Sequence, residues 1–502
     1  MSENNFFAEL KARFQDRPER VFLRLPDGRI ITYGDIDHLS AAFAGALLNT
    51  GAKAGDRVVA QIEKSPENVA LYLGAMRAGL VYVPLNTAYT AEEIDYFLSD
   101  AAPSIFVCAP DNEDNLSAIA TKAGVKKTFT LGANQNGSII NAANNAMPFD
   151  DIHPRHADDL AVILYTSGTT GRSKGAMLSH ENLSSNANTL NSLWGFTSKD
   201  VLLHALPIFH IHGLFVALHV AMLGACEILF LPKFDVAEVR RYLRDATVMM
   251  GVPTFYTRLL AEKDFGPDDA KHMRLFISGS APLTEETFNG FEARSGHKIL
   301  ERYGMSEAGM IASNPLDGDR VAGTVGYALD GVNLRVTDDN GLPAPINQPG
   351  NVEVKGPNIF KGYWRNPEKT KEEFTGDGYF KTGDIGALDE AGRLTLSGRS
   401  KDLIIAGGYN IYPKEIEAVL DAVPGVSEST VIGVPHPDMG EGVIAVLVAE
   451  KTPVEDATLQ NAISSLAKFK RPRKIFWIDE LPRNAMGKVQ KQILREKYQG
   501  AF

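Results

Sequence analysis

A segment rich in glycine and hydroxyl residues, residues 165–175, has the residue types that bind a polyphosphate. It directly follows the apolar run 160–164, which predicts a buried strand. Glycines let backbone N–H groups turn toward an anion, hydroxyl groups donate further hydrogen bonds, and Lys174 supplies positive charge. The segment is not a Walker A loop, because Gly175 and Ala176 follow Lys174 where that loop needs Ser or Thr. We therefore predict a phosphate-binding loop, with a solvated turn as the alternative. Its candidate ligands are Thr166, Ser167, Gly168, Thr169, Thr170, Gly171 and Lys174.

Strand-like and helix-like segments alternate along the chain up to about residue 400. Strands are predicted over residues 57–62, 81–85 and 104–108, and helices over residues 67–78 and 92–98. Such alternation is typical of a doubly wound α/β architecture.

The pattern changes in the last third of the chain. From about Gly331, short strands separated by turns predict a small β subdomain. About a hundred residues with an α+β pattern follow, enough for a separate small domain. The predicted organisation is a large N-terminal domain over residues 1–398, a connection over 399–401 and a small C-terminal domain over 402–502.

Composition excludes several classes of protein. The chain has 502 residues, and 51 cationic against 62 anionic side chains give a net charge of −11, which argues against non-specific nucleic-acid binding. Its two cysteines, Cys108 and Cys226, lie in apolar contexts and do not indicate a disulfide framework. The longest apolar region, residues 214–231, is interrupted by polar residues, so no membrane insertion is expected. The N-terminus lacks the features of a signal peptide, and we expect a cytoplasmic protein.

The order of the remaining motifs, together with the glycine-rich loop, resembles the adenylate-forming superfamily of acyl-CoA synthetases, luciferases and nonribosomal-peptide adenylation domains. The matching segments span nearly the whole chain: residues 206–213, 278–283, 301–307, 382–384, 398–399 and 482–488. The resemblance implies a luciferase-like fold in which the small C-terminal domain is mobile. It also implies two half-reactions. ATP and a carboxylate give an acyl-adenylate and pyrophosphate, and the thiol of coenzyme A then displaces AMP.

The resemblance also assigns nucleotide ligands. Tyr303 flanks the adenine, the hydroxyl of Ser306 binds the α-phosphate, and Glu307 holds Mg²⁺, for which a carboxylate is suited. Ser306 replaces the usual Thr, which keeps the hydroxyl but loses a methyl group that restricts its rotamer. Thr169 is the second metal candidate. The other nucleotide candidates by this match are Gly279, Ser280, Ala281, Glu301, Gly304, Met305, Asp384 and Arg399.

Two parts of the C-terminal region carry the implied catalysis. Lys488 matches the lysine that stabilises the negative charge between carboxylate and α-phosphate. In relatives the C-terminal domain then swings, so that this lysine leaves and a loop lining the pantetheine path arrives. Here that loop contains Gly407, Gly408 and Tyr409. Lys401 matches the hinge residue, usually Asp or Lys.

Residues near the expected acid site indicate a dicarboxylate. Arg302 and Arg258 place guanidinium groups where an enzyme for apolar acids would avoid them, and a second carboxylate would pair with them. The alternative is pairing with protein acids, such as Glu301 or Asp245. By the match, His210 lies between ATP and the acid, and Ile211 and Met310 line the acid site.

Four further segments resemble malonyl-CoA synthetases: residues 64–65, 84–90, 313–315 and 467–470. Two departures lie beside the acid pocket: Ile211 stands where bacterial relatives often carry Thr, and Ala308–Gly309 replaces a usual Thr–Asn pair. They leave acceptance of methylmalonate or larger malonates open. The expected activity is AMP-forming malonate–CoA ligation.

Four alternatives remain at this point. One is a ligase for another short acid, such as oxalate or propionate. A second is an adenylation protein that charges a separate carrier. A third is a nucleotide-binding module without activity, against which the intact Lys488 and Glu307 argue. The fourth is luciferase-type chemistry. Small-molecule substrates, no nucleic acid and at most weak homo-oligomerisation are expected.

Overall fold

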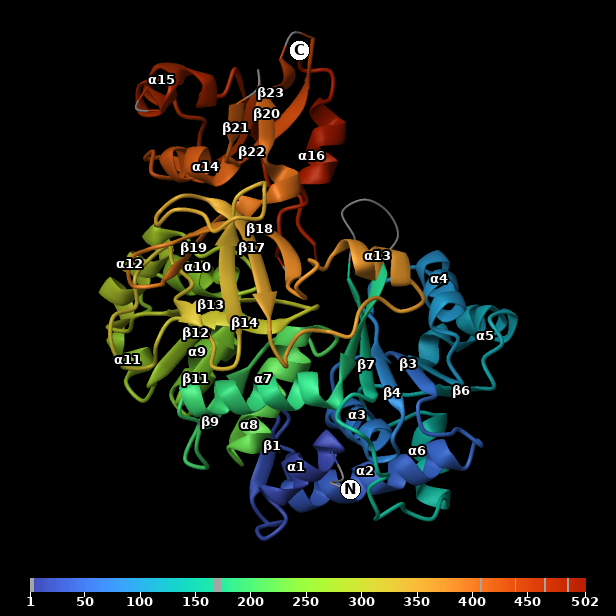
Figure 1. The fold of residues 1–502 in the computed structure, drawn as a ribbon. Coiled ribbons are helices and arrows are strands. Elements are labelled where there is room, and N and C mark those ends of the chain that lie inside the picture. The colour runs from blue at the N-terminus through green and yellow to red at the C-terminus, as the bar shows by residue number, and fades with distance from the viewer. Residues whose placement is uncertain (1–3, 167–172, 407–408, 438, 465, 485–486) are drawn as a thin grey trace.

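The protein is described by a computed structural model that covers residues 4–166, 173–406, 409–437, 439–464, 466–484 and 487–502. Its chain forms four β-sheets with helices between and around them (Figure 1). Two large sheets make up most of the first 330 residues, a four-stranded sheet follows, and a five-stranded sheet lies at the C-terminal end of the molecule (Figure 1).

The first large sheet has six strands in the order β6-β5-β3-β4-β7-β8. All neighbours pair in parallel except β7 and β8, which form an antiparallel hairpin. The strands are β3 (Arg57–Gln61), β4 (Val81–Pro84), β5 (Ile105–Cys108), β6 (Lys127–Thr130), β7 (Leu160–Thr166) and β8 (Lys174–Ser179). The associated helices are α3 (Pro66–Arg77), α4 (Ala91–Ala101), α5 (Glu113–Lys122) and α6 (Ser138–Asn145).

The second large sheet has nine strands in the order β15-β14-β13-β12-β11-β9-β10-β1-β2, parallel at its centre and antiparallel at both edges. Its strands are β1 (Val21–Arg24), β2 (Ile30–Thr32), β9 (Val201–His204), β10 (Glu227–Phe230), β11 (Val248–Gly251), β12 (Leu275–Ser278), β13 (Leu300–Met305), β14 (Gly309–Ser313) and β15 (Tyr327–Ala328). The helices of this region are α1 (Phe6–Ala12), α2 (Tyr33–Leu48), α7 (His180–Leu193), α8 (Leu218–Leu223), α9 (Val236–Leu243), α10 (Pro253–Ala261), α11 (Pro267–Ala270) and α12 (Glu285–Ser295).

The remaining two sheets are mainly antiparallel. The four-stranded sheet contains β16 (Asn333–Thr337), β17 (Gly350–Lys355), β18 (Phe380–Leu388) and β19 (Leu394–Arg399). Helix α13 (Pro367–Glu372) lies between β17 and β18 in the sequence. The last sheet contains β20 (Ile404–Ala406), β21 (Tyr409–Ile411), β22 (Val426–His436), β23 (Gly440–Ala449) and β24 (Lys474–Ile478). It is flanked by α14 (Pro413–Asp421), α15 (Asp456–Ile463) and α16 (Lys491–Tyr498) (Figure 1).

Local sequence explains where the elements begin. Helix α3 starts after Ser65, whose side chain accepts the N–H of Asn68, and Pro66 occupies the first turn, where no N–H is needed. Helix α4 starts with a capping box in which Thr90 and Glu93 bond each other's backbone. The doubly wound fold, the five predicted strand and helix positions and the small β subdomain are confirmed.

The N-terminal and C-terminal parts of the chain bury separate apolar cores. The largest cluster of buried apolar side chains includes nothing beyond Leu394, whereas the C-terminal sheet buries two clusters of its own from Ile404 onward. No helix among the described residues is long and apolar enough to cross a membrane.

Candidate nucleotide and acid site

The predicted phosphate loop connects the two strands of the β7–β8 hairpin. Thr166 pairs with Lys174 at the last rung of this antiparallel hairpin. Beside the hairpin, Tyr96 on α4 donates a hydrogen bond to the carbonyl of Ser173 at 2.6 Å, and Tyr165 donates to Asp100 at 2.5 Å. These bonds fix the base of the loop. The candidate ligands Ser167, Gly168, Thr169, Thr170 and Gly171 lie outside the described residues.

One tyrosine connects the phosphate loop to the expected metal ligand. The ammonium of Lys174 lies 5.1 Å from the ring centroid of Tyr363, and the hydroxyl of Tyr363 donates to Glu307 at 3.1 Å. Glu307 is buried, and that burial raises its pKa. A bound divalent cation would offset the cost of ionising this carboxylate, so Glu307 fits the role of a Mg²⁺ ligand. Sequence reasoning did not select Tyr363, which has no local signal.

A cluster of Asp384, Arg399 and Tyr303 has the groups to bind the ribose of a nucleotide. Asp384 and Arg399 face each other across β18 and β19, with Arg399 Nε 2.8 Å from a carboxylate oxygen of Asp384. Tyr303 on β13 donates its hydroxyl to the other oxygen. Two neighbouring strands and a third from the nine-stranded sheet thus converge on one carboxylate, which can accept hydrogen bonds from the hydroxyls of a ribose.

The loop after β12 approaches the same region. A Cβ added to Gly279 would lie 2.5 Å from the guanidinium carbon of Arg302, so only glycine allows this contact. Ser280 has φ +72°, a left-handed conformation that is uncommon for a residue with a side chain, and its Oγ lies 3.2 Å from Nδ1 of His212. Ala281 follows and is partly exposed, as are Gly304, Met305 and Ser306 at the end of β13.

Arg302 carries buried donors that no group in the described part of the chain uses. Its exposed fraction is 3%, and its Nε and Nη2 atoms are buried without a hydrogen-bond partner. Burial lowers its pKa to about 10, so it remains charged at neutral pH. The adjacent Glu301 instead accepts the N–H of Leu283 at 3.2 Å, and burial raises the pKa of Glu301 to about 7. Among the described residues, neither Glu301 nor Asp245 forms an ion pair with Arg302 or Arg258.

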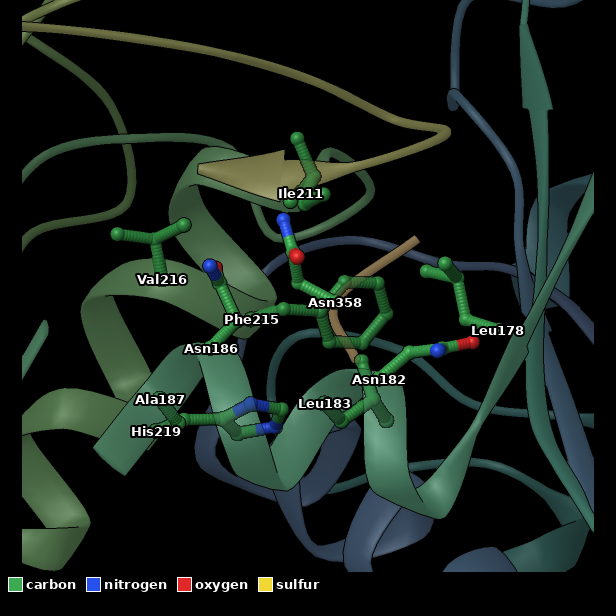
Figure 2. Close-up of a pocket in the computed structure, with 11 residues that line it drawn as sticks. Leu178, Asn182, Leu183, Asn186, Ala187, Ile211, Phe215, Val216, His219 and Asn358 are labelled. Carbon is green, nitrogen blue, oxygen red and sulfur yellow. The ribbon is translucent and has the colours of Figure 1, made fainter. Parts of the chain in front are cut away.

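Residues 205–213, called the gate segment below, run from β9 into the π-helix His212–Ala217 and include His210, which is predicted to lie between ATP and the acid. The Nε2 atom of His210 is buried without a partner, and burial lowers the pKa of His210 to about 4, so its ring is neutral at pH 7. Ile211 borders a small cavity that α7 and the π-helix enclose (Figure 2). In the wall of this cavity, Asn186 holds the backbone of Met310 by two hydrogen bonds of 2.8 and 3.0 Å.

The second arginine lies on α10. Arg258 is exposed, with its guanidinium 6.0 Å from the ring centroid of Phe234. It lies one helical turn after Thr254, on the same helix face. A Cβ added to Gly487 would lie 3.5 Å from Thr254, so this face of α10 is the one that the Lys488 loop approaches.

Lys488 reaches the candidate ribose cluster from the C-terminal sheet. Its ammonium interacts electrostatically with Arg399, Asp384 and Lys401. Within its loop, Arg483 donates a hydrogen bond of 2.5 Å to the carbonyl of Gly487. The Lys488 side chain keeps contact with solvent, but its nitrogen is crowded by protein atoms. This crowding, followed by repulsion from Arg399, lowers the pKa of Lys488 to about 8.

The connection between the last two sheets contains Lys401. It lies in the short 3-10 helix Ser400–Asp402, directly between β19 and β20, and is exposed. Asp402 forms an ion pair with Arg495 of α16 at 2.6 Å. Tyr409, on β21, is 55% exposed and stacks on Phe469 with ring centroids 4.5 Å apart. Gly407 and Gly408 lie outside the described residues.

Comparison with known proteins identifies the family of this chain. Residues 8–364 match the family of AMP-binding enzymes, and residues 415–488 match the AMP-binding enzyme C-terminal domain. The chain is 38% identical over 481 residues to a malonate–CoA ligase of Arabidopsis thaliana, covering 89% of this chain and 78% of the relative. It is 35% identical over 491 residues to a mitochondrial malonate–CoA ligase of Mus musculus, covering 89% and 83%.

Solved structures of MatB from Rhodopseudomonas palustris are also similar. The ATP-bound structure superposes with a TM-score of 0.97 at 52% identity, and the apo structure with a TM-score of 0.86 at 53% identity; each comparison covers 100% of both chains. The higher score belongs to the form that holds ATP. By the family match over residues 8–364, the chain belongs to the AMP-binding enzymes, with the α/β fold of the acyl-CoA synthetases.

Proposed function

We propose that this protein is an ATP-dependent malonate–CoA ligase that forms malonyl-AMP and then malonyl-CoA, releasing pyrophosphate and AMP. The single observation that carries the choice of acid is Arg302, a buried guanidinium with two unpartnered nitrogens. A charge in this state is costly without a partner, and a substrate carboxylate is a suitable one. The malonate–CoA ligases among the relatives support the same choice.

The nucleotide would lie between the glycine-rich loop and the Asp384–Arg399 pair. Lys174 would contact the phosphates, Asp384 the ribose hydroxyls and Ser306 the α-phosphate. The loop of Gly279, Ser280 and Ala281 would face the adenine, opposite Tyr303. Glu307, with Thr169, would hold Mg²⁺, which neutralises phosphate charge when bound.

The acid would lie beyond His210. Arg302 would pair with the carboxylate that does not react, and Arg258 would face the same space from α10, with Ile211 and Met310 as the apolar walls. A neutral His210 can border both substrates without adding charge. Acceptance of methylmalonate is a question for experiment.

Lys488 would stabilise the adenylation transition state. A preorganised positive charge is most effective where negative charge develops, which here is between the attacking carboxylate and the α-phosphate. The similarity to an ATP-bound relative and the closeness of Lys488 to Asp384 and Arg399 support an arrangement ready for this first half-reaction.

The second half-reaction requires another arrangement. We take residues 1–398 as the adenylation domain, 399–401 as the hinge and 402–502 as the mobile domain. Lys401 is then the pivot, and Gly407, Gly408 and Tyr409 form the coenzyme A face. Cytoplasmic location and weak homo-oligomerisation also stay predictions.

The experiment is a panel of mono- and dicarboxylic acids from two to eight carbons, assayed for AMP formation with ATP, Mg²⁺ and coenzyme A. The expected result is the highest kcat/KM with malonate and product formation that requires free coenzyme A. Higher kcat/KM with propionate or another monocarboxylate would contradict the assignment.

A further inference from the structure

A buried cation outside the proposed catalytic groups connects the first large sheet to the gate. The ammonium of Lys64, in the loop between β3 and α3, lies 2.8 Å from Nδ1 of His204 and donates to the carbonyls of His204 at 3.0 Å and Leu206 at 2.9 Å. It also lies 4.3 Å from the ring centroid of Phe230. Three oriented contacts use all three donors of an ammonium group.

The contacts determine the tautomer of His204. Its Nε2 lies 2.9 Å from the carbonyl of Gly213, which can only accept, so Nε2 carries the proton. Nδ1 is then free to accept from Lys64. A proton on Nδ1 would face the ammonium, and burial together with the charge of Lys64 lowers the pKa of His204 well below its usual value. His204 is therefore neutral and hydrogen-bonded at both ring nitrogens.

These bonds hold both ends of one segment. Lys64 binds the carbonyl of Leu206 near its start, and His204 binds the carbonyl of Gly213 at its end. A Cβ added to Gly213 would lie 2.0 Å from the carbonyl oxygen of Pro207, so the two ends approach as closely as backbone allows. Between them lie the gate residues His210 and Ile211, and then His212.

No carboxylate within ion-pair distance of Lys64 appears among the described side chains. Lys64 keeps partial solvent exposure, but its ammonium is surrounded by protein atoms, and burial lowers its pKa well below the usual range. An apolar residue would fill this space without that desolvation cost. The lysine therefore contributes what an apolar residue cannot, which is three directed hydrogen bonds to the ends of the gate segment.

We propose that Lys64 and His204 form a gate clamp: two positioning residues that hold residues 205–213 in the shape that closes the acid site. They do not contact substrate. The clamp acts on whichever acid the enzyme uses, and only its readout with malonate rests on the proposed function.

The test compares Lys64→Met and His204→Gln with the wild-type full-length enzyme. Lys64→Met keeps an unbranched side chain, one atom shorter, and removes its donors. His204→Gln keeps a side-chain N–H donor for the carbonyl of Gly213. Tyr72→Phe is the control, because it removes a buried hydrogen bond of the same length, 2.8 Å, to a histidine, His219, outside the gate segment.

Two measurements are made on each variant: hydrogen–deuterium exchange of peptides spanning residues 205–213, and KM for the acid and for ATP. In Lys64→Met we expect faster exchange in these peptides alone and a KM for the acid raised about 10- to 150-fold, as for lost hydrogen bonds to a charged group. KM for ATP should change less than about two-fold, and kcat less than KM. We expect His204→Gln to show a smaller loss of the same kind and Tyr72→Phe to match wild type.

Unchanged exchange in residues 205–213, or equal increases in the KM for acid and for ATP, would overturn the clamp. The exchange measurement needs no substrate, so its result stands even if wild type prefers an acid other than malonate. In that case the proposed function fails and the clamp is tested with the preferred acid. If Lys64→Met does not fold, Lys64→Arg, which keeps the charge but changes the donor geometry, takes its place with the same expectations and a smaller effect.

Discussion

Replacing Arg302 by leucine should convert a dicarboxylate site into one for monocarboxylates. The residue is 3% exposed, its Nε and Nη2 have no partner, and its neighbour Glu301 is bound elsewhere. Malonate differs from propionate in having a carboxylate where propionate has a methyl group. A free guanidinium therefore favours malonate and opposes propionate, whereas leucine reverses both effects.

The magnitude follows from leaving one partner of a buried charge pair unpaired, about 2–5 kcal/mol. At about 1.36 kcal/mol per factor of ten, this corresponds to a kcat/KM for malonate lowered roughly 30- to 5000-fold. Propionate should lose little or gain. Folding should survive, because exchanging a buried unpaired charge for an apolar side chain is often neutral or stabilising.

The assay is kcat/KM for both acids by pyrophosphate release, with thermal unfolding of each variant as the control for folding. Arg302→Lys serves as the matched variant: it keeps the charge and loses the bidentate geometry, so its malonate value should fall between those of wild type and Arg302→Leu. Arg258→Leu should lower malonate activity less, since Arg258 is exposed. If Arg302→Leu slows malonate and propionate by the same factor, Arg302 has only a structural role and the argument for malonate fails.

Four further predictions concern the two half-reactions and the metal site. Lys488→Ala should lower acyl-adenylate formation about 10²–10³-fold while coenzyme A transfer from supplied acyl-AMP continues, and equal losses in both steps would contradict the role. Because the acting form of Lys488 is protonated and its pKa is about 8, kcat/KM for ATP should be maintained below pH 8 and fall above it, and Lys488→Arg should move the fall to higher pH. Proline at position 401 has a φ near that of the 3-10 helix Ser400–Asp402 and restricts its change. In Lys401→Pro, single-turnover adenylation should therefore persist while thioesterification slows. Wild-type rates in both steps would place the hinge elsewhere. Tyr363→Phe keeps the ring beside Lys174 but removes the hydrogen bond to Glu307. The Mg²⁺ concentration for half-maximal activity should therefore rise about ten-fold or more. An unchanged Mg²⁺ titration would show that Tyr363 does not support the metal site.

Sequence alone predicted the elements around the candidate site, because their signal is local. The apolar run before the glycine-rich loop has the length of a buried strand, and the structure forms β7 there, with the loop at the hairpin end. The alternation of patterns likewise predicted the parallel sheet, because a parallel strand must be followed by a crossover. Such features depend on neighbours within a few residues, so they can be recognised in the sequence.

Contacts between distant segments could not be predicted in this way. Tyr363 meets Glu307 across 56 residues, and Lys64 meets His204 across 140. Neither pair has a characteristic spacing, because its distance is set by how two sheets pack. The π-helix His212–Ala217 was also missed, since an apolar run has no period that separates a π turn from an α turn.

The charges around Lys488 connect the two proposed half-reactions. Lys488 lies among Arg399, Lys401 and the carboxylates Asp384 and Asp402, and its pKa is lowered first by desolvation and then by repulsion from both cations. Bringing the C-terminal sheet to this position thus has an electrostatic cost that a bound polyphosphate offsets. Once pyrophosphate has left, much of that offset is gone while the repulsion remains. The charge arrangement therefore favours the present position of Lys488 before adenylation and its departure afterwards, which is the order in which the proposed hinge must move.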